Sequence, residues 1–351
     1  MSDISQPTVE NAEKSPTWRR GRQSITLKDI AADTGLSIST VSRALARNPV
    51  ISESTRSVVE EAAARLNYRP NAQAKALRSQ KSNTIGIVLP NIRNPYFNQL
   101  ASAIQEAASL KGYCCMMANS AESPELINSA LDILNSQQVD GIIVVPHVQS
   151  AQQITTITEQ GTPIVAADRT VTHNAVPSVT SDPLPAMKEA LRMLSLNPGA
   201  AIGYLAGPQD TSTGRERLEA ITSIKSELGI PSPDVYFGGY SSEAGFAGTH
   251  ELLDRGVNSI LTGDMMMTVG AIQAIYARGL RIGKDVALIG YDNTPAFMLQ
   301  ERPITTIDQQ VDDMGQRAFD MLYSHMNNGE RATSCVIPTT LALRASHSLA
   351  V

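Results

Sequence analysis

The sequence predicts an N-terminal all-α headpiece followed by an α/β domain of two lobes, each built on a doubly wound parallel sheet. With 351 residues, the chain is too long for one ordinary core. Short helical patterns with their own start and stop signals fill residues 24–70, and apolar strands alternate with amphipathic helices from residue 84 onward. We expect ligands to bind where the carboxyl ends of the strands face a cleft between the lobes.

Charge separates the first fifth of the chain from the rest. Residues 17–81 hold twelve basic and five acidic residues, a net charge of +7, although the whole chain carries a net charge of -5. The remainder therefore carries -12. A basic module on an acidic body suits contact with a phosphate backbone, although a solvated charged surface has the same composition.

Residues 1–23 are polar and indicate a disordered leader with a basic end. They contain no apolar segment of the kind found in secretory signals, and no later apolar run reaches the length of a membrane span. The three cysteines cannot form a disulfide framework and have no ligand spacing around them. We therefore expect a cytoplasmic protein that makes no membrane contact and needs no metal or cofactor.

Three short helices are predicted in the headpiece. The first, residues 27–34, ends at Gly35, because glycine readily takes the left-handed conformation that closes a helix. Ser37 is placed to cap the second helix, residues 38–46, and Ser52 is placed to cap the third.

A helix-turn-helix needs a small residue at the helix crossing, a glycine in the turn and an apolar residue that closes the core. Ala31, Gly35 and Val41 meet these needs at suitable spacing. An ordinary pair of amphipathic helices would meet them equally well.

The α/β domain contains many strand and helix units. The predicted strands cover residues 85–89, 113–117, 141–145, 163–167, 201–205, 235–237, 259–262, 286–291, 304–307 and 335–343. The predicted helices cover residues 97–110, 124–136, 187–196, 215–228, 243–255, 265–278 and 311–326. We assign residues 84–184 and 311–334 to the first lobe and residues 185–310 and 335–351 to the second.

Three segments carry a family resemblance: LKDIAADTGLSISTVSRAL at residues 27–45, VISESTR at residues 50–56 and LNYRPN at residues 66–71. Together they closely resemble the lactose-repressor (LacI/GalR) family of bacterial regulators, and the resemblance extends from about Ile25 to the C-terminus. It implies a repressor that binds a pseudo-palindromic DNA operator as a homodimer, under the control of a small effector.

The resemblance places the second headpiece helix in the major groove of DNA. It implies base contacts for Ile38, Ser39 and Arg43, and phosphate contacts for Thr40 and Ser42. An arginine reads guanine edges more strongly than a short hydroxyl or an apolar side chain reads a base. Much of the sequence discrimination is therefore expected to depend on Arg43.

Residues 71–82 match the hinge helix and linker of the same family. The helical part is under three turns long, so it should be marginal on its own in water. The resemblance implies that Leu77 enters the minor groove and kinks the operator, with Lys75 and Arg78 beside it at the phosphates. An ordinary interdomain linker is the alternative.

The two lobes resemble periplasmic sugar-binding proteins, and the ribose-binding type is the closest match. The match implies an effector site at the strand ends, formed by Asn94, Tyr96, Phe97, Asp168, Arg169, Arg215, Tyr240, Asp292 and Gln309. Carboxylates beside guanidinium groups suit vicinal hydroxyls, and aromatic rings suit the C–H face of a sugar. One departure is Gly263, which stands where these relatives have an amide, so one hydroxyl contact is missing or made through water.

Two other classes of protein could have α/β lobes of this kind. A periplasmic sugar carrier would have a signal peptide and no basic headpiece. An enzyme on the α/β scaffold would need a nucleophile elbow, a phosphate loop or zinc spacing, and the sequence contains none of these. For the regulator, ribose or a related pentose or nucleoside is the expected effector, with a purine or a hexose as alternatives.

Overall fold

The computed structural model describes residues 25–69, 81–171 and 176–349. The chain divides into two compact units, Met1–Arg78 and Ser79–Val351. Across the described ranges, we find no helix with both the length and the apolar character that a membrane crossing requires.

The first unit contains the three predicted helices, α1 (Leu27–Thr34), α2 (Ile38–Leu45) and α3 (Glu53–Arg65). Gly35 closes α1 with a φ of 69°. Ser37 and Ser52 cap the next two helices, because each hydroxyl accepts a backbone N–H from the third residue of its helix. The helices enclose a small core of Ile30, Val41, Ala44, Val59, Ala62 and Ala63.

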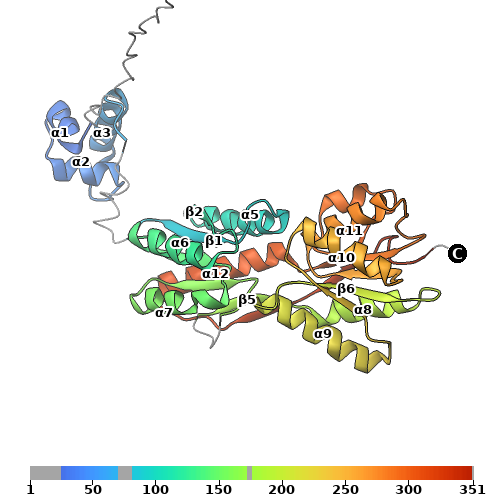
Figure 1. The fold of residues 1–351 in the computed structure, drawn as a ribbon. Helices are drawn as coiled ribbons and strands as arrows, with labels where there is room; N and C mark the ends of the chain where they lie inside the picture. Colours follow the sequence, from blue (N-terminus) through green and yellow to red (C-terminus); the bar gives the residue numbers. More distant parts are fainter. Residues whose placement is uncertain (1–24, 70–80, 172–175, 350–351) are drawn as a thin grey trace, which may run out of the picture. The chain divides into compact units, whose positions relative to one another are not determined.

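The second unit has two lobes, and Figure 1 shows α5, α6, α7 and α12 on one lobe and α8 to α11 on the other. The first lobe contains β1 (Thr84–Leu89), α5 (Pro95–Leu110), β2 (Cys114–Asn119), α6 (Pro124–Ser136), β3 (Gly141–Val144), η1 (Val148–Ser150), α7 (Ala151–Glu159), β4 (Ile164–Ala167), β5 (Ser178–Asp182), α12 (Val311–Asn328) and β11 (Cys335–Pro338). The second lobe contains α8 (Leu184–Ser195), β6 (Ile202–Ala206), α9 (Ser212–Leu228), β7 (Asp234–Phe237), α10 (Ser242–Asp254), β8 (Ser259–Thr262), α11 (Met265–Ala277), β9 (Ala287–Tyr291), η3 (Pro295–Leu299), β10 (Thr305–Asp308) and β12 (Thr340–Ala342).

Each lobe has one sheet of six strands. The orders are β11-β5-β4-β3-β1-β2 and β12-β10-β9-β8-β6-β7. Neighbouring strands are parallel except for the β10–β12 pair. In both sheets the strand order reverses at the first strand of the lobe, β1 or β6, and ligands of such sheets bind beside that point. The predicted fold class is confirmed.

The chain crosses between the lobes near Asp182, Gln310 and Thr339. The last crossing corrects the predicted strand 335–343, which we assigned to the second lobe. Its first part, β11, pairs with β5 in the first lobe, and only β12 pairs in the second lobe. Pro338 lacks the N–H that would continue a ladder, and the Thr339 hydroxyl donates to Asp182 O at 2.8 Å, so the strand changes sheets here.

Helix α7 and strand β5 were not predicted, nor were the short helices η1 and η3. The β5 sequence, SVTSD, has only one apolar residue, yet four of its five residues are buried because β4 and β11 flank it. A strand inside a sheet can thus be polar where it leads into a binding cleft.

Candidate functional site

Helix α2 of the headpiece has one buried side and one exposed side. Val41 and Ala44 are fully buried against the other two helices. Ile38, Ser39 and Arg43 are exposed on the opposite side. The three side chains predicted to read bases therefore share one accessible face.

The hydroxyl groups at the start of α2 are held together. Ser37 Oγ lies 2.8 Å from both Ser39 Oγ and Thr40 Oγ1. Thr40 and Ser42, the predicted phosphate contacts in this helix, are partly buried at its edge. The remaining predicted DNA contacts, Lys75, Leu77 and Arg78, lie outside the described residues, as do the leader and the hinge helix.

The cleft between the lobes is built on two equivalent aspartates. Asp168 follows β4 in the first lobe and Asp292 follows β9 in the second, with φ values of 64° and 65°. Each backbone N–H donates to the next strand of its sheet, to Val179 O at 2.9 Å and to Ile307 O at 2.7 Å. This left-handed turn puts both carboxylates at the carboxyl ends of the strands, where they are almost fully buried.

These carboxylates line a cavity that side chains of both lobes enclose. Its lining residues are Asn94, Tyr96, Phe97, Asp168, Arg169, Thr213, Arg217, Tyr240, Asp264, Asp292 and Gln309. The remaining space is about 20 Å³, room for about one water molecule. An effector can therefore enter only when the lobes separate or the side chains exchange their present partners.

The lining side chains leave little free space and are hydrogen-bonded to one another. Tyr96 donates to Asp168 at 2.6 Å. Gln309 Nε2 donates to Asp292 at 2.6 Å, and Gln309 Oε1 accepts from Arg217 at 2.9 Å. A bound ligand would replace these contacts, because its polar atoms would form hydrogen bonds with the same donors and acceptors.

The structure corrects one predicted lining residue. Arg215 is exposed, and its guanidinium donates to Gln209 O at 3.0 Å instead of facing the cavity. Arg217, two residues later, is buried and takes that place. Successive helical residues are about 100° apart, so these two arginines lie on opposite faces of α9.

A sequence signal for Arg217 lies in the buried stripe of α9. Ala220, Ile221 and Ile224 form the buried stripe of α9. Counting back three, four and seven residues along this stripe leads to Arg217 and not to Arg215.

Two further lining residues were also missed. Thr213 Oγ1 lies 3.0 Å from the Tyr240 hydroxyl. Asp264 caps α11 through one carboxylate oxygen and receives Asn94 Nδ2 at 3.5 Å on the other. In the sequence, the role of helix cap is enough to explain Asp264, and no local pattern indicates its contact with Asn94.

Gly263 leaves no room for a side chain at its position. A Cβ added there would lie 2.6 Å from Leu205 O. Its carbonyl oxygen instead accepts a hydrogen bond from Arg217 Nη1 at 2.6 Å. The Gly263 carbonyl thus holds Arg217 at the position where the sugar-binding relatives have an amide side chain.

Burial changes the protonation of the cavity. It raises the pKa of Asp292 to about 7, although the Arg217 charge acts in the opposite direction. Burial also raises the pKa of Asp264. Ligand groups that donate hydrogen bonds to Asp292 would therefore stabilise its ionised form.

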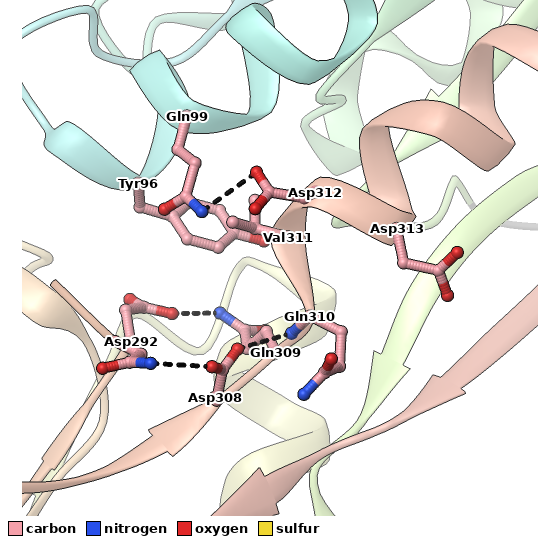
Figure 2. Close-up of a pocket in the computed structure, with 10 residues that line it drawn as sticks. Tyr96, Gln99, Asp292, Asp308, Gln309, Gln310, Val311, Asp312 and Asp313 are labelled. Atoms are coloured by element: carbon pink, nitrogen blue, oxygen red, sulfur yellow. Dashed lines mark hydrogen bonds between the residues drawn. The ribbon is translucent and has the colours of Figure 1, made fainter. Parts of the chain in front are cut away.

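A second cavity of about 170 Å³ adjoins the first at the crossing near Gln310 (Figure 2). Its carboxylates already have partners. Asp308 accepts from Asn293 Nδ2 and from Gln310 N, and Asp312 accepts from Gln99 at 3.0 Å. In the described ranges no group of three or more potential ligand side chains could hold a metal ion.

Two family models match the chain. Residues 26–71 match the bacterial regulatory proteins of the lacI family, and residues 82–345 match the periplasmic binding proteins and sugar binding domain of the LacI family.

Individual relatives agree with these matches. The catabolite control protein A of Priestia megaterium is 30% identical over 92% of this chain and 99% of its own. The ribose operon repressor of Escherichia coli K12 is 29% identical over 85% of this chain and 92% of its own. The lac repressor dimer bound to operator and the anti-inducer ONPF matches with a TM-score of 0.84 and 27% identity, over 93% of this chain and 100% of that one. The chain is therefore a DNA-binding transcriptional regulator of the lacI family, and not an enzyme.

Proposed function

We propose that this regulator represses transcription as a cytoplasmic homodimer on a pseudo-palindromic operator, and that ribose, a related pentose or a ribose-containing nucleoside releases it. The observation that carries the effector assignment is the cavity, in which both lobes contribute carboxylates, guanidinium groups and aromatic rings. Carboxylate and guanidinium groups side by side suit vicinal hydroxyls. The similarity to the ribose operon repressor supports the same effector class.

The cavity connects directly to the crossings between the lobes. Asp292 accepts from Gln309, and Gln309 Oε1 also accepts from Ser181 Oγ at 2.6 Å. Ser181 lies in β5, one residue before the crossing at Asp182, and Gln309 directly precedes the crossing at Gln310. An effector that takes over the Asp292 carboxylate therefore changes the contacts that set the angle between the lobes, which supports control of the hinge and headpiece.

The homodimer is supported by an exposed apolar edge. Within the described ranges, β2 pairs only with β1 and ends the first sheet. Met116 and Met117 on this strand are 40% and 56% exposed, and Leu110 in the preceding helix is 84% exposed. A second copy of the chain would cover such an edge.

Calorimetric titration of the purified protein tests the effector class. The panel contains ribose, other pentoses, hexoses, nucleosides and purines. Saturable binding of ribose or a ribonucleoside is expected. Binding confined to hexoses or free purine bases would contradict the assignment and favour the alternative effectors.

Replacing Arg43 with Ala is expected to weaken specific operator binding by ~1–3 kcal/mol and to relax the preference at one symmetric base position. Arg43 is exposed on the free face of α2. Binding to operator and to random duplex, measured by fluorescence anisotropy, separates the two contributions. Arg192→Ala, which removes the same charge from α8, is the control. An equal loss on both duplexes would exclude Arg43 as a base reader.

Effector binding is expected to weaken as the pH falls below about 7, because Asp292 must be ionised to accept sugar hydroxyls. Calorimetry in buffers of different ionisation enthalpy should detect proton release near pH 6 to 7 that disappears at about pH 8.5. Because folding raises the pKa of this carboxyl from 3.8, its protonated form stabilises the free protein, and this contribution is fully present below pH 3.8. The contribution is lost as the pH rises through about 7. The thermal shift produced by the effector should therefore be larger at alkaline pH. Tighter binding at acidic pH would contradict the role of Asp292.

A further inference from the structure

Glu122 does not line the cavity, yet it holds one of the lining residues. The guanidinium of Arg169 donates through Nη1 and Nη2 to the two carboxylate oxygens of Glu122, at 2.7 and 2.9 Å. The Arg169 side chain is only 2% exposed, whereas that of Glu122 is 39% exposed. A bidentate, charge-assisted pair of this kind fixes both the position and the charge of the arginine.

The backbone at Ala121 and Glu122 is in the left-handed region. Ala121 and Glu122 have φ values of 49° and 60°, and neither is glycine. Such conformations are unfavourable for residues other than glycine and persist where surrounding contacts enforce them. Glu122 N donates to Pro90 O at 3.1 Å, which ties this turn to the end of β1.

Because of this pairing, Arg169 offers the cavity little positive charge. The Nε–H group is buried without a hydrogen-bond partner, and Nε lies 3.7 Å from Asp168 Oδ2. The guanidinium carbon lies 5.6 Å from the centre of the Tyr240 ring. The Nε–H group of Arg169 is therefore a donor that a hydroxyl oxygen of a ligand can engage.

Arg217, the other arginine at the cavity, has both Nη atoms hydrogen-bonded to neutral acceptors. Arg217 donates to Gly263 O and to Gln309 Oε1. The nearby helix N-termini, which often bind anions, are closed by their own caps: Asn94 accepts from Tyr96 N and Asp264 accepts from Met267 N. An incoming phosphate would therefore meet the carboxylates of Asp168, Asp264 and Asp292 without a free guanidinium fork.

We propose that Glu122 positions Arg169 and determines charge selectivity, so that the cleft accepts a neutral polyhydroxylated effector and rejects its phosphorylated form. This inference rests on the proposed function and names a property of the same site. Removal of the Glu122 charge would take away one of the two carboxylates that pair with Arg169 and leave Asp168 as the other, so the site beside the cavity becomes more positive. The affinity for a phosphorylated ligand should then rise relative to the affinity for the neutral one.

The test compares neutral and phosphorylated ligands in pairs: ribose with ribose 5-phosphate, glucose with glucose 6-phosphate, and uridine with uridine monophosphate. Calorimetry on the full chain gives the affinity ratio within each pair for the parent, Glu122→Gln and Glu125→Gln. Glu125 is an exposed carboxylate three residues away whose partner is Ser123. Thermal melting and operator binding of all three proteins show whether the fold is retained.

The parent is expected to prefer the neutral member of the binding pair by about 100-fold or more. Glu122→Gln should reduce this ratio by about tenfold or more, while Glu125→Gln keeps the parental ratio. A general structural defect would weaken both members together and leave the ratio unchanged, which would overturn the inference while the proposed function stands. Preference of the parent for a phosphorylated member would overturn it as well. If no member of any pair binds, the proposed function fails and the inference fails with it.

Discussion

Replacing Arg217 with Ala should lower effector affinity by about 100-fold or more, whereas Arg215→Ala should leave it unchanged. Arg217 is 5% exposed, and its guanidinium lies 4.0 Å from the centre of the Tyr291 ring while it donates to Gln309. Loss of this group leaves the Asp292 and Gln309 side chains without their buried cationic neighbour. Arg215 has the same chemistry on the exposed side of the same helix, so it is a matched control.

Calorimetric titration with the effector measures both variants. Arg217→Lys retains the charge without the bidentate fork, and it should also bind poorly, because the position needs the guanidinium geometry. Thermal melting and operator binding identify any variant that fails to fold. A normal affinity in folded Arg217→Lys, or a large loss in Arg215→Ala, would show that α9 faces the cleft differently.

The second large effect is expected for Asp292→Asn, which should bind operator like the parent and no longer be released by effector. The carboxylate belongs to the chain of contacts from the cavity through Gln309 to Ser181 at the crossings. An amide there keeps the size of the side chain but cannot accept hydroxyl protons on both of its terminal atoms. An effector-induced change in operator affinity, typically 1–3 kcal/mol in allosteric proteins, should fall to about zero.

Asp285→Asn is the control for this variant, because Asp285 carries the same group on the surface of the same lobe and pairs there with Arg281. Operator binding is measured by anisotropy with and without effector. Release of Asp292→Asn at the parental effector concentration would remove this carboxylate from the signalling route.

The sequence predicted the parts of the site that follow directly from strand ends. Asp168 and Asp292 each end a short apolar run, and the left-handed turn at both positions puts them in the cleft. Tyr96, Phe97 and Gln309 were placed in the same way. All five line the cavity.

Other parts depend on contacts that local patterns do not show. The choice between Arg215 and Arg217 depends on how α9 is rotated against its sheet. The path of residues 335–343 depends on a change of sheet at Thr339. Glu122 is held by a strained turn without glycine, so no turn residue in the sequence marks it.

Release by the effector is measured as the operator affinity of the parent protein at increasing concentrations of ribose or a ribonucleoside. The operator is first selected from random duplexes by the purified protein, and binding is followed by anisotropy at fixed salt, because phosphate contacts make the affinity salt-dependent. Saturating effector should raise the Kd for operator by about tenfold or more, at the concentrations at which calorimetry shows the cleft filling. An unchanged or tighter operator complex with the cleft filled would contradict it.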